Sequence, residues 1–261
     1  MQHALADELS RVGPWVWPVA LGVLGAIVGS FIAALVIRWP QGRSVLAGRS
    51  ACDACGRTLA PVDLVPLASA LWLRGRCRSC QASIDPRHWQ IELCAAAIGV
   101  IAGLAVSGPV AAAGALFGWL LLALAALDVA EYWLPDRLTL ALALTGIGVG
   151  LAGAPPILSD RLIGGVAGFG SLWLIAVSYR LVRHREGLGG GDPKLFGAIG
   201  LWLGWRVLPI VLVLACLAGF ALLLGRLLAG QSAARDDRLP FGALLAIAAY
   251  PAWLVMLASL A

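Results

Sequence analysis

The sequence has few charged residues. Only 13% of its 261 residues are charged, and its mean hydropathy is +0.89. A soluble domain carries about 25% charged residues, so this composition excludes one. Runs such as FGWLLLALAAL (117–127) lack the alternation of polar and apolar residues that a membrane β-barrel requires. The sequence therefore predicts an all-α integral membrane protein.

Several signals of other protein classes are also missing. The first 40 residues have a mixed-charge start and no small-residue exit, so they do not resemble a cleaved signal peptide. No GxSxG motif is present, and the three histidines form no metal-ligand pattern. The net charge of +5 reflects arginine-rich loops rather than binding to nucleic acid.

What the chain does contain is about eight apolar spans, at roughly 20 residues per membrane crossing. A polar segment rich in Arg, Pro and Cys separates the first two. We therefore expect residues 1–37 to be the N-terminus and first transmembrane helix, 38–90 a small extramembrane domain, and 91–261 a membrane-embedded domain. The sixth span is short, and 194–225 could be a tight hairpin or a partly re-entrant element. The eight spans cover about 18–37, 91–107, 110–128, 138–153, 162–180, 194–205, 207–225 and 241–260.

The arginines predict the orientation of these spans. If 38–90 faces the cytoplasm, alternating the spans places all basic residues except Arg11, Arg161 and Arg206 on that side. The opposite connections SGP (107–109) and GAPPILSD (153–160) contain no arginine or lysine. Because basic residues concentrate in cytoplasmic loops, we expect a cytoplasmic polar domain in a bacterial inner-membrane protein.

Two CxxC pairs, CDAC (Cys52, Cys55) and CRSC (Cys77, Cys80), lie 21 residues apart in the polar segment. Two such turns can each direct two sulfurs at one tetrahedral ion, which predicts a structural four-thiolate zinc site. Two disulfides or four ordinary thiols are the alternative. A reducing cytoplasm disfavours the disulfides.

Two acidic residues stand next to apolar spans. Asp128 ends LLLALAALD, and Asp192 follows the glycines of GLGGGDPKLF. Gly189, Gly190 and Gly191 are expected to permit positive φ and close approach of a substrate strand. Taken singly, Asp128 could extend to the membrane interface and Asp192 could cap a helix.

Taken together, the two acids suggest a catalytic pair. The 63 residues between them allow two crossings, which return the chain to the same membrane face. Two carboxyls that meet in a partly desolvated site share a proton. One can then act as general base towards water while the other polarises a carbonyl. That arrangement predicts an aspartic protease, with Asp128 and Asp192 as its catalytic residues.

The motifs as a set resemble the type IV prepilin peptidases, membrane enzymes of the GxGD aspartic protease class. The resemblance covers nearly the whole chain, and Ala33 departs from it where the family often has Asn. It implies that Asp128 and Asp192 cleave the leaders of prepilins and pseudopilins at the cytoplasmic face, and that Gly189–Gly191 admit the substrate. It further implies that Cys52, Cys55, Cys77 and Cys80 bind zinc, and that S-adenosylmethionine methylates the new N-terminus. The matching stretches are GSF (29–31), RWP (38–40), the cysteine region (52–80), IELCAA (91–96), LDVAEYWLPDRLT (127–139), GLGGGDPKLFGAIGLWLGW (187–205) and LPFGALLA (239–246).

Three other readings remain open from the residues. A transporter or ion pathway would place acids near the membrane midplane and show a repeat between the halves of the chain, and neither feature is visible. A zinc-bearing scaffold would use the aspartates only as helix caps. A peptidase could also lack the methyltransferase activity.

Overall fold

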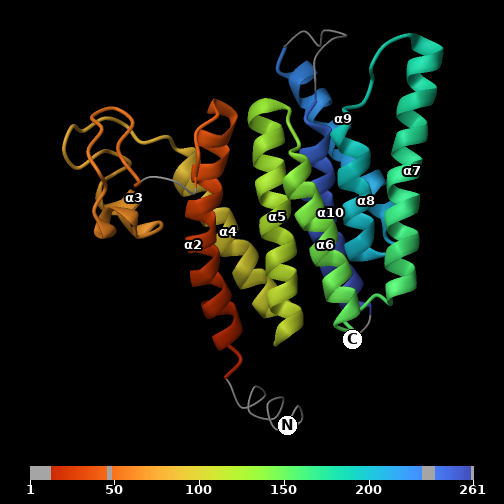
Figure 1. The fold of residues 1–261 in the computed structure, drawn as a ribbon, viewed down its shortest axis with the longest axis horizontal. Helices are drawn as coiled ribbons and strands as arrows, with labels where there is room; N and C mark the ends of the chain where they lie inside the picture. Colours follow the sequence, from red (N-terminus) through yellow and green to blue (C-terminus); the bar gives the residue numbers. More distant parts are fainter. Residues whose placement is uncertain (1–12, 46–48, 231–238, 260–261) are drawn as a thin grey trace. The chain divides into compact units, whose positions relative to one another are not determined.

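A computed structural model describes residues 13–45, 49–230 and 239–259 (Figure 1). Between the first two long helices lie only short turns: η1 (Trp39–Gln41), η2 (Pro61–Leu64) and α3 (Ala68–Trp72). The described residues contain two isolated β-bridges and no strand, which confirms the predicted all-α class. The long helices are α2 (Val16–Arg38), α4 (Arg87–Ala105), α5 (Pro109–Glu131), α6 (Asp136–Leu151), α7 (Leu158–Arg183), α8 (Gly191–Leu203), α9 (Leu208–Leu228) and α10 (Phe241–Ala258).

Six of these helices are long and apolar enough to cross a membrane: α2, α4, α5, α7, α9 and α10. The other two, α6 and α8, have only 16 and 13 residues. At 1.5 Å per residue, α8 is about 20 Å long, shorter than the roughly 30 Å hydrocarbon core. The predicted multi-pass helical membrane protein is thus confirmed, and its short sixth segment is a helix too short to span a bilayer unaided.

The chain forms two compact units that divide within α5, the first ending at Trp119 and the second beginning at Leu120. In the first unit α2 packs directly on α4. A Cβ added to Gly99 would lie 2.1 Å from the carbonyl oxygen of Leu21, so this contact requires glycine. The expected division into 1–37, 38–90 and 91–261 stays a prediction.

The second unit is built around the short helix α8. A Cβ on Gly164 of α7 would lie 2.5 Å from the carbonyl oxygen of Gly200 of α8, so these two backbones touch. On the α6 side, the indole N–H of Trp202 donates a 2.7 Å hydrogen bond to the carbonyl of Leu142. Nearly all of α8 is buried by such contacts, which fixes the position of the residues at its start.

Candidate active site and candidate metal centre

Asp128 lies in the last turn of α5 and is 5% exposed. Its Oδ2 accepts a 2.7 Å hydrogen bond from the backbone N–H of Ala243, in the first turn of α10. The N–H groups at a helix start have no partner within the helix and carry partial positive charge. A helix start 115 residues further along the chain therefore holds this carboxyl in place.

Asp192 lies in the first turn of α8 and is likewise 5% exposed. Its Oδ2 accepts a 3.0 Å hydrogen bond from the backbone N–H of Gly189, three residues earlier. This bond ties the carboxyl to the glycine loop before the helix; the residue that caps α8 is Gly190, so Asp192 is not the helix cap that the alternative expected. The carboxyl of Asp192 also lies within electrostatic reach of Asp128. The fold thus brings the two acids together, on different helices of the second unit.

The three glycines before Asp192 meet different surroundings. A Cβ on Gly189 would lie 3.1 Å from Oδ2 of Asp192, and one on Gly191 would lie 2.8 Å from Cβ of Leu134, whereas Gly190 faces open space. None of the three has a positive φ in the structure, so the loop does not use the conformational freedom that glycine permits. Close packing explains Gly189 and Gly191 instead, because a side chain at either position would crowd the acid or its neighbour.

Leu134, in the loop between α5 and α6, lies against two helix starts: that of α8, which carries Asp192, and that of α10, which binds Asp128. A Cβ on Gly191 at the start of α8 would meet Leu134, and a Cβ on Gly242 at the start of α10 would lie 2.7 Å from its Cδ1. The same Cβ on Gly242 would lie 3.1 Å from Oδ2 of Asp128. Leu134 therefore spaces the two helix starts. Nothing in the sequence around this loop leucine pointed to that role.

Two further acids lie near Asp128 in sequence, and both are exposed. Glu131 lies on the surface at the end of α5. Asp136 starts α6 and forms a 2.7 Å ion pair with Lys194, the only lysine of the chain. In the described part of the second unit, Asp128 and Asp192 are the only buried acids. Burial therefore separates this pair from its neighbours.

Cys52, Cys55, Cys77 and Cys80 come together between α2 and α4. Their sulfur atoms all lie within 4.8 Å of one another, and those of Cys52 and Cys80 are 3.8 Å apart. Four sulfurs at about 2.3 Å from a tetrahedral zinc ion would be about 3.8 Å apart, so the donor set fits that ion. No disulfide joins any cysteine in the described chain.

Each cysteine pair sits in a turn of the same design. In both, the N–H of the first cysteine donates a 2.9 Å hydrogen bond to the carbonyl five residues later. The residue after the second cysteine is left-handed in both turns: Gly56 with φ +69° and Gln81 with φ +59°. Left-handed φ costs about 1–2 kcal/mol for a residue with a side chain. The second turn therefore adopts the left-handed geometry with Gln81, whose side chain makes that backbone conformation less favourable than it is for glycine.

The thiols of the cluster differ in acidity. Backbone N–H groups of Cys80 and Ser79 lower the pKa of Cys77 to about 6. The backbone N–H of Ala82 lowers the pKa of Cys80, but burial and hydrogen bonds with the neighbouring thiols outweigh it and raise that pKa to about 11. The backbone N–H groups around Cys77 thus favour its thiolate, the form in which cysteine binds a metal ion.

Comparison with known proteins identifies the family. Residues 23–106 match the bacterial peptidase A24 N-terminal domain, and residues 115–224 match the type IV leader peptidase family. The prepilin leader peptidase/N-methyltransferase of Aeromonas hydrophila is 34% identical over 97% of this chain and 95% of its own. The protein of the same name from Burkholderia pseudomallei (strain K96243) is 40% identical over 86% of this chain and 81% of its own. The chain belongs to the type IV leader peptidase family. No solved structure matches it.

This leader peptidase family member also has a buried arginine whose role the sequence did not reveal. The orientation argument placed Arg161 on the non-cytoplasmic side, yet the structure leaves it 1% exposed in the first turn of α7. An ionisable residue at the start of an apolar span is a signal for such a site, but its partners come from distant segments. Its guanidinium fixes the ends of α6 and α8 opposite to Asp136 and Asp192 by donating to the carbonyls of Gly146, Ala154, Pro155, Pro156, Leu201 and Trp202.

Proposed function

We propose that this protein cleaves the leaders of type IV prepilins and pseudopilins, with Asp128 and Asp192 as its catalytic residues. The observation that carries the proposal is the pair itself: two buried carboxyls on separate helices, within electrostatic reach and each fixed by a backbone N–H. Family membership and the names of the relatives supply the substrate class.

The chemistry follows from two acids that share one proton. The ionised carboxyl accepts a proton from a water molecule, whose oxygen attacks the scissile carbonyl. The protonated carboxyl donates a hydrogen bond to the carbonyl oxygen and stabilises the charge that develops there. The shared proton then passes to the leaving amine. The Asp128 oxygen bonded to Ala243 and the Asp192 oxygen bonded to Gly189 keep both groups oriented throughout.

The glycines before Asp192 provide the approach for the peptide. Gly190 faces open space, so an extended substrate strand can pass close to its backbone. Gly189 and Gly191 instead leave room for Asp192 and Leu134. We assign substrate access to this loop, with Gly190 as its most open point.

The proposed function includes methylation of the new N-terminus with S-adenosylmethionine as methyl donor. The relatives are named as leader peptidases and N-methyltransferases together, and the matches extend over both halves of the chain. A methyl donor bears an electrophilic methyl group on a sulfonium. The N-terminal amine released by cleavage is the matching nucleophile.

We further propose that Cys52, Cys55, Cys77 and Cys80 hold a structural zinc ion. The spacing of their sulfurs fits the ion, and four protein ligands leave no open position for catalysis. With zinc bound the cluster carries a net charge of −2, and several arginines lie near it in the sequence. Zinc would fix the two cysteine turns against each other.

We place the protein in the bacterial inner membrane with both the zinc site and the aspartates at the cytoplasmic face. The arginine distribution supports this orientation. The two acids lie in terminal turns, Asp128 at the end of α5 and Asp192 at the start of α8, rather than at mid-helix as a transporter would have them. A prepilin helix in the bilayer could therefore present its scissile bond without being extracted.

Purified protein incubated with a prepilin tests this function. We expect Asp128→Asn and Asp192→Asn each to abolish cleavage, lowering its rate by more than about 10³-fold, because an amide cannot act as a carboxylate base. Glu131→Gln is the matched control, since it neutralises an exposed acid one turn from Asp128. Intact mass of the product reports cleavage and methylation together.

Cleavage by either asparagine variant at a rate near that of the wild type would contradict the assignment of the pair. Loss of cleavage in Glu131→Gln would show that an exposed neighbouring acid is also required. Burial would then no longer distinguish Asp128 and Asp192 as the catalytic pair. A cleaved product whose mass shows no added methyl group would remove methylation from the proposed function and leave the peptidase activity in place.

A further inference from the structure

The segment between α2 and α4 exposes large apolar side chains on η2, on α3 and on the turn that joins them. Leu71 and Trp72, at the end of α3, are 79% and 72% exposed. Because η2 and α3 contact each other, these side chains lie near one another on the surface, which we call the apolar edge. Clustered apolar side chains at a surface mark contact with a partner or a membrane. The apolar edge consists of Val62, Leu64, Val65, Leu71 and Trp72.

The exposed charges around the apolar edge are positive. Arg74 and Arg76 directly follow α3, and both are exposed. Asp63 is the only acid between residues 54 and 84. Its side chain is 4% exposed and lies 3.0 Å from Arg78. Apolar side chains beside basic residues, without an exposed acid, are typical of a surface that lies on an anionic bilayer.

A membrane-spanning helix holds each end of this segment. Helix α2 ends at Arg38 and α4 begins at Arg87, and both helices are long and apolar enough to cross a membrane. Arginines at the ends of such helices extend to the lipid headgroups. Figure 1 shows α3 beside α2 rather than beyond the end at which the chain leaves that helix. The apolar edge therefore lies within reach of the bilayer.

A hydrogen bond fixes the depth of α3 along α4. The backbone N–H of Leu67, the residue before α3, donates a 2.8 Å hydrogen bond to Oε2 of Glu92. Glu92 follows Arg87, the first residue of α4, by about one and a half turns, which is roughly 8 Å along the helix axis. The headgroup layer on each side of the hydrocarbon core is about 5–8 Å thick. The start of α3 therefore lies near the boundary between headgroups and acyl chains.

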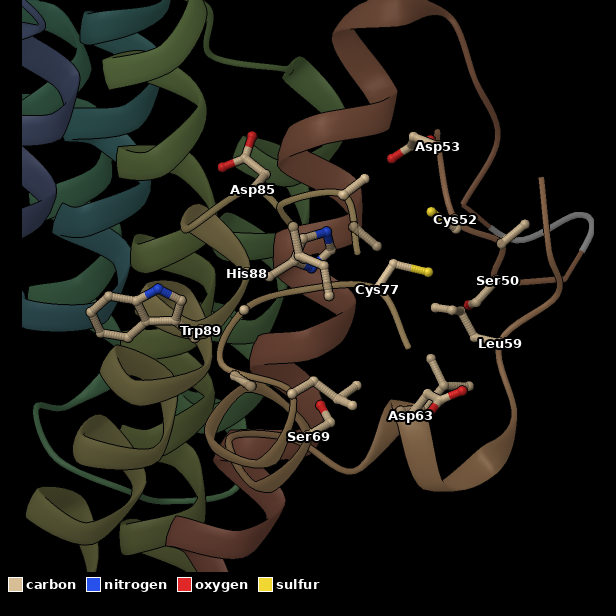
Figure 2. A pocket seen from close by; sticks show the side chains of 18 of the residues that line it. Ser50, Cys52, Asp53, Leu59, Asp63, Ser69, Cys77, Asp85, His88 and Trp89 are labelled. Atoms are coloured by element: carbon tan, nitrogen blue, oxygen red, sulfur yellow. The ribbon is translucent and has the colours of Figure 1, made fainter. Parts of the chain in front are cut away.

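The cysteine cluster lies to one side of this boundary. In Figure 2, Asp63 of η2 and Ser69 of α3 lie on one side of the segment and Asp53 lies on the other, with Cys52 and Cys77 between them. The bilayer and the metal would therefore contact different parts of the segment.

We propose that the apolar edge docks on the bilayer itself, with Leu71 and Trp72 among the upper acyl chains and Arg74 and Arg76 at anionic headgroups. Tryptophan suits this depth because its ring is apolar and its N–H can reach water or headgroups. The inference goes beyond the proposed function, since it requires only that α2 and α4 cross the membrane. The bilayer would then cover apolar surface that the segment does not bury in a core of its own.

Quenching of tryptophan fluorescence by brominated lipids tests this contact. The full-length protein is placed in nanodiscs that hold one copy and contain phosphatidylcholine with anionic phosphatidylglycerol. The difference in emission between the wild type and Trp72→Phe isolates Trp72 from the other tryptophans. We expect bromines near the headgroup end of the acyl chains to quench this signal by about half or more, and bromines near the chain ends to quench it less. Trp173→Phe is the matched control, because Trp173 is 49% exposed near the middle of α7 and should respond more to the deeper bromines.

The arginines are tested with a water-soluble quencher. Acrylamide reaches Trp72 only when the apolar edge leaves the bilayer. Each basic residue at an anionic surface favours contact about fivefold, so the double variant Arg74→Gln, Arg76→Gln should raise acrylamide quenching of Trp72 about twofold or more in anionic nanodiscs. It should have no effect in nanodiscs of phosphatidylcholine alone. Arg206→Gln is the control, since that arginine is exposed and lies in the second unit.

A Trp72 signal that no brominated lipid quenches would overturn the proposal, whether acrylamide reaches the ring or a protein surface shields it. Equal acrylamide quenching in the double arginine variant and the wild type would overturn the contact with headgroups. A second measurement needs no variant: a phospholipid with a photoreactive diazirine beside its headgroup should crosslink to residues 61–76 rather than to 50–57. The reverse pattern would contradict docking through the apolar edge.

Discussion

The cysteine region (residues 49–90) and helix α8 achieve fixed geometry by different means. In α8, Phe196 is 2% exposed and Ile199 is fully buried, because α6 and α7 pack on both sides. In the cysteine region, Leu71 and Trp72 are 79% and 72% exposed, and Cys77 is the only apolar side chain of that region that is buried. A segment with so little buried apolar surface needs another source of stability.

The difference shows which interactions fix the geometry of each candidate site. The aspartates are held by close helix packing and by N–H groups at helix starts. The cysteine turns are held by local hydrogen bonds and, in our proposal, by a zinc ion bound to the four sulfurs. Removing the metal or changing a cysteine turn should therefore affect the cysteine region, whereas a change in helix packing should affect the aspartates.

Removing the metal should have the largest effect and should be confined to the cysteine region. A structural zinc site contributes about 10–16 kcal/mol, more than a small domain's net stability, so chelation or Cys77→Ser should unfold residues 49–90. Limited proteolysis should then cut this region while α5–α10 stay intact. Cys94→Ser is the matched control, since Cys94 is exposed and lies outside the cluster. Equal protection before and after chelation would show that local hydrogen bonds suffice.

A change in packing should act only on the peptidase site. Leu134→Ala removes the side chain that separates the starts of α8 and α10, so the two carboxyls lose their spacing. A shift of about 1 Å can cost about 10²-fold, and we expect kcat for prepilin cleavage to fall by about 10- to 100-fold with a smaller change in KM. Zinc content should not change. Leu134→Met should restore most of the rate, and failure of that rescue would argue against a spacing role.

The smallest effect should come from the turn residue in which the two cysteine pairs differ. Gln81→Gly places glycine at a left-handed position and should stabilise the second turn by about 0.5–1 kcal/mol. Gly56→Ala at the equivalent position should destabilise the first turn by a similar amount, since a Cβ there meets no atoms and only the backbone is strained. Zinc retention against a competing chelator measures both. Shifts of the same sign in the two variants would show that the turns are not equivalent.

The agreement between sequence and structure is uneven for physical reasons. The spans were predictable because each helix satisfies its own backbone hydrogen bonds and needs only apolar length. The capping role considered for Asp192 is not found, because the helix starts one residue earlier than that role requires and Gly190 is its cap. The positive φ that the glycine loop permits is not used, because Gly189 and Gly191 make room for Asp192 and Leu134 rather than for a turn.

By itself the sequence determined the helices, the four-cysteine set and the two acids, since each is written in local composition or short spacing. Only the tertiary structure decided what surrounds them: the bond from Ala243 to Asp128, the contacts of Leu134 and the six acceptors of Arg161. It also decided that Glu92, buried on α4, accepts a hydrogen bond from the backbone N–H of Leu67, 25 residues earlier in the chain. These contacts join segments far apart in the chain, and packing, not periodicity, selects which of them form.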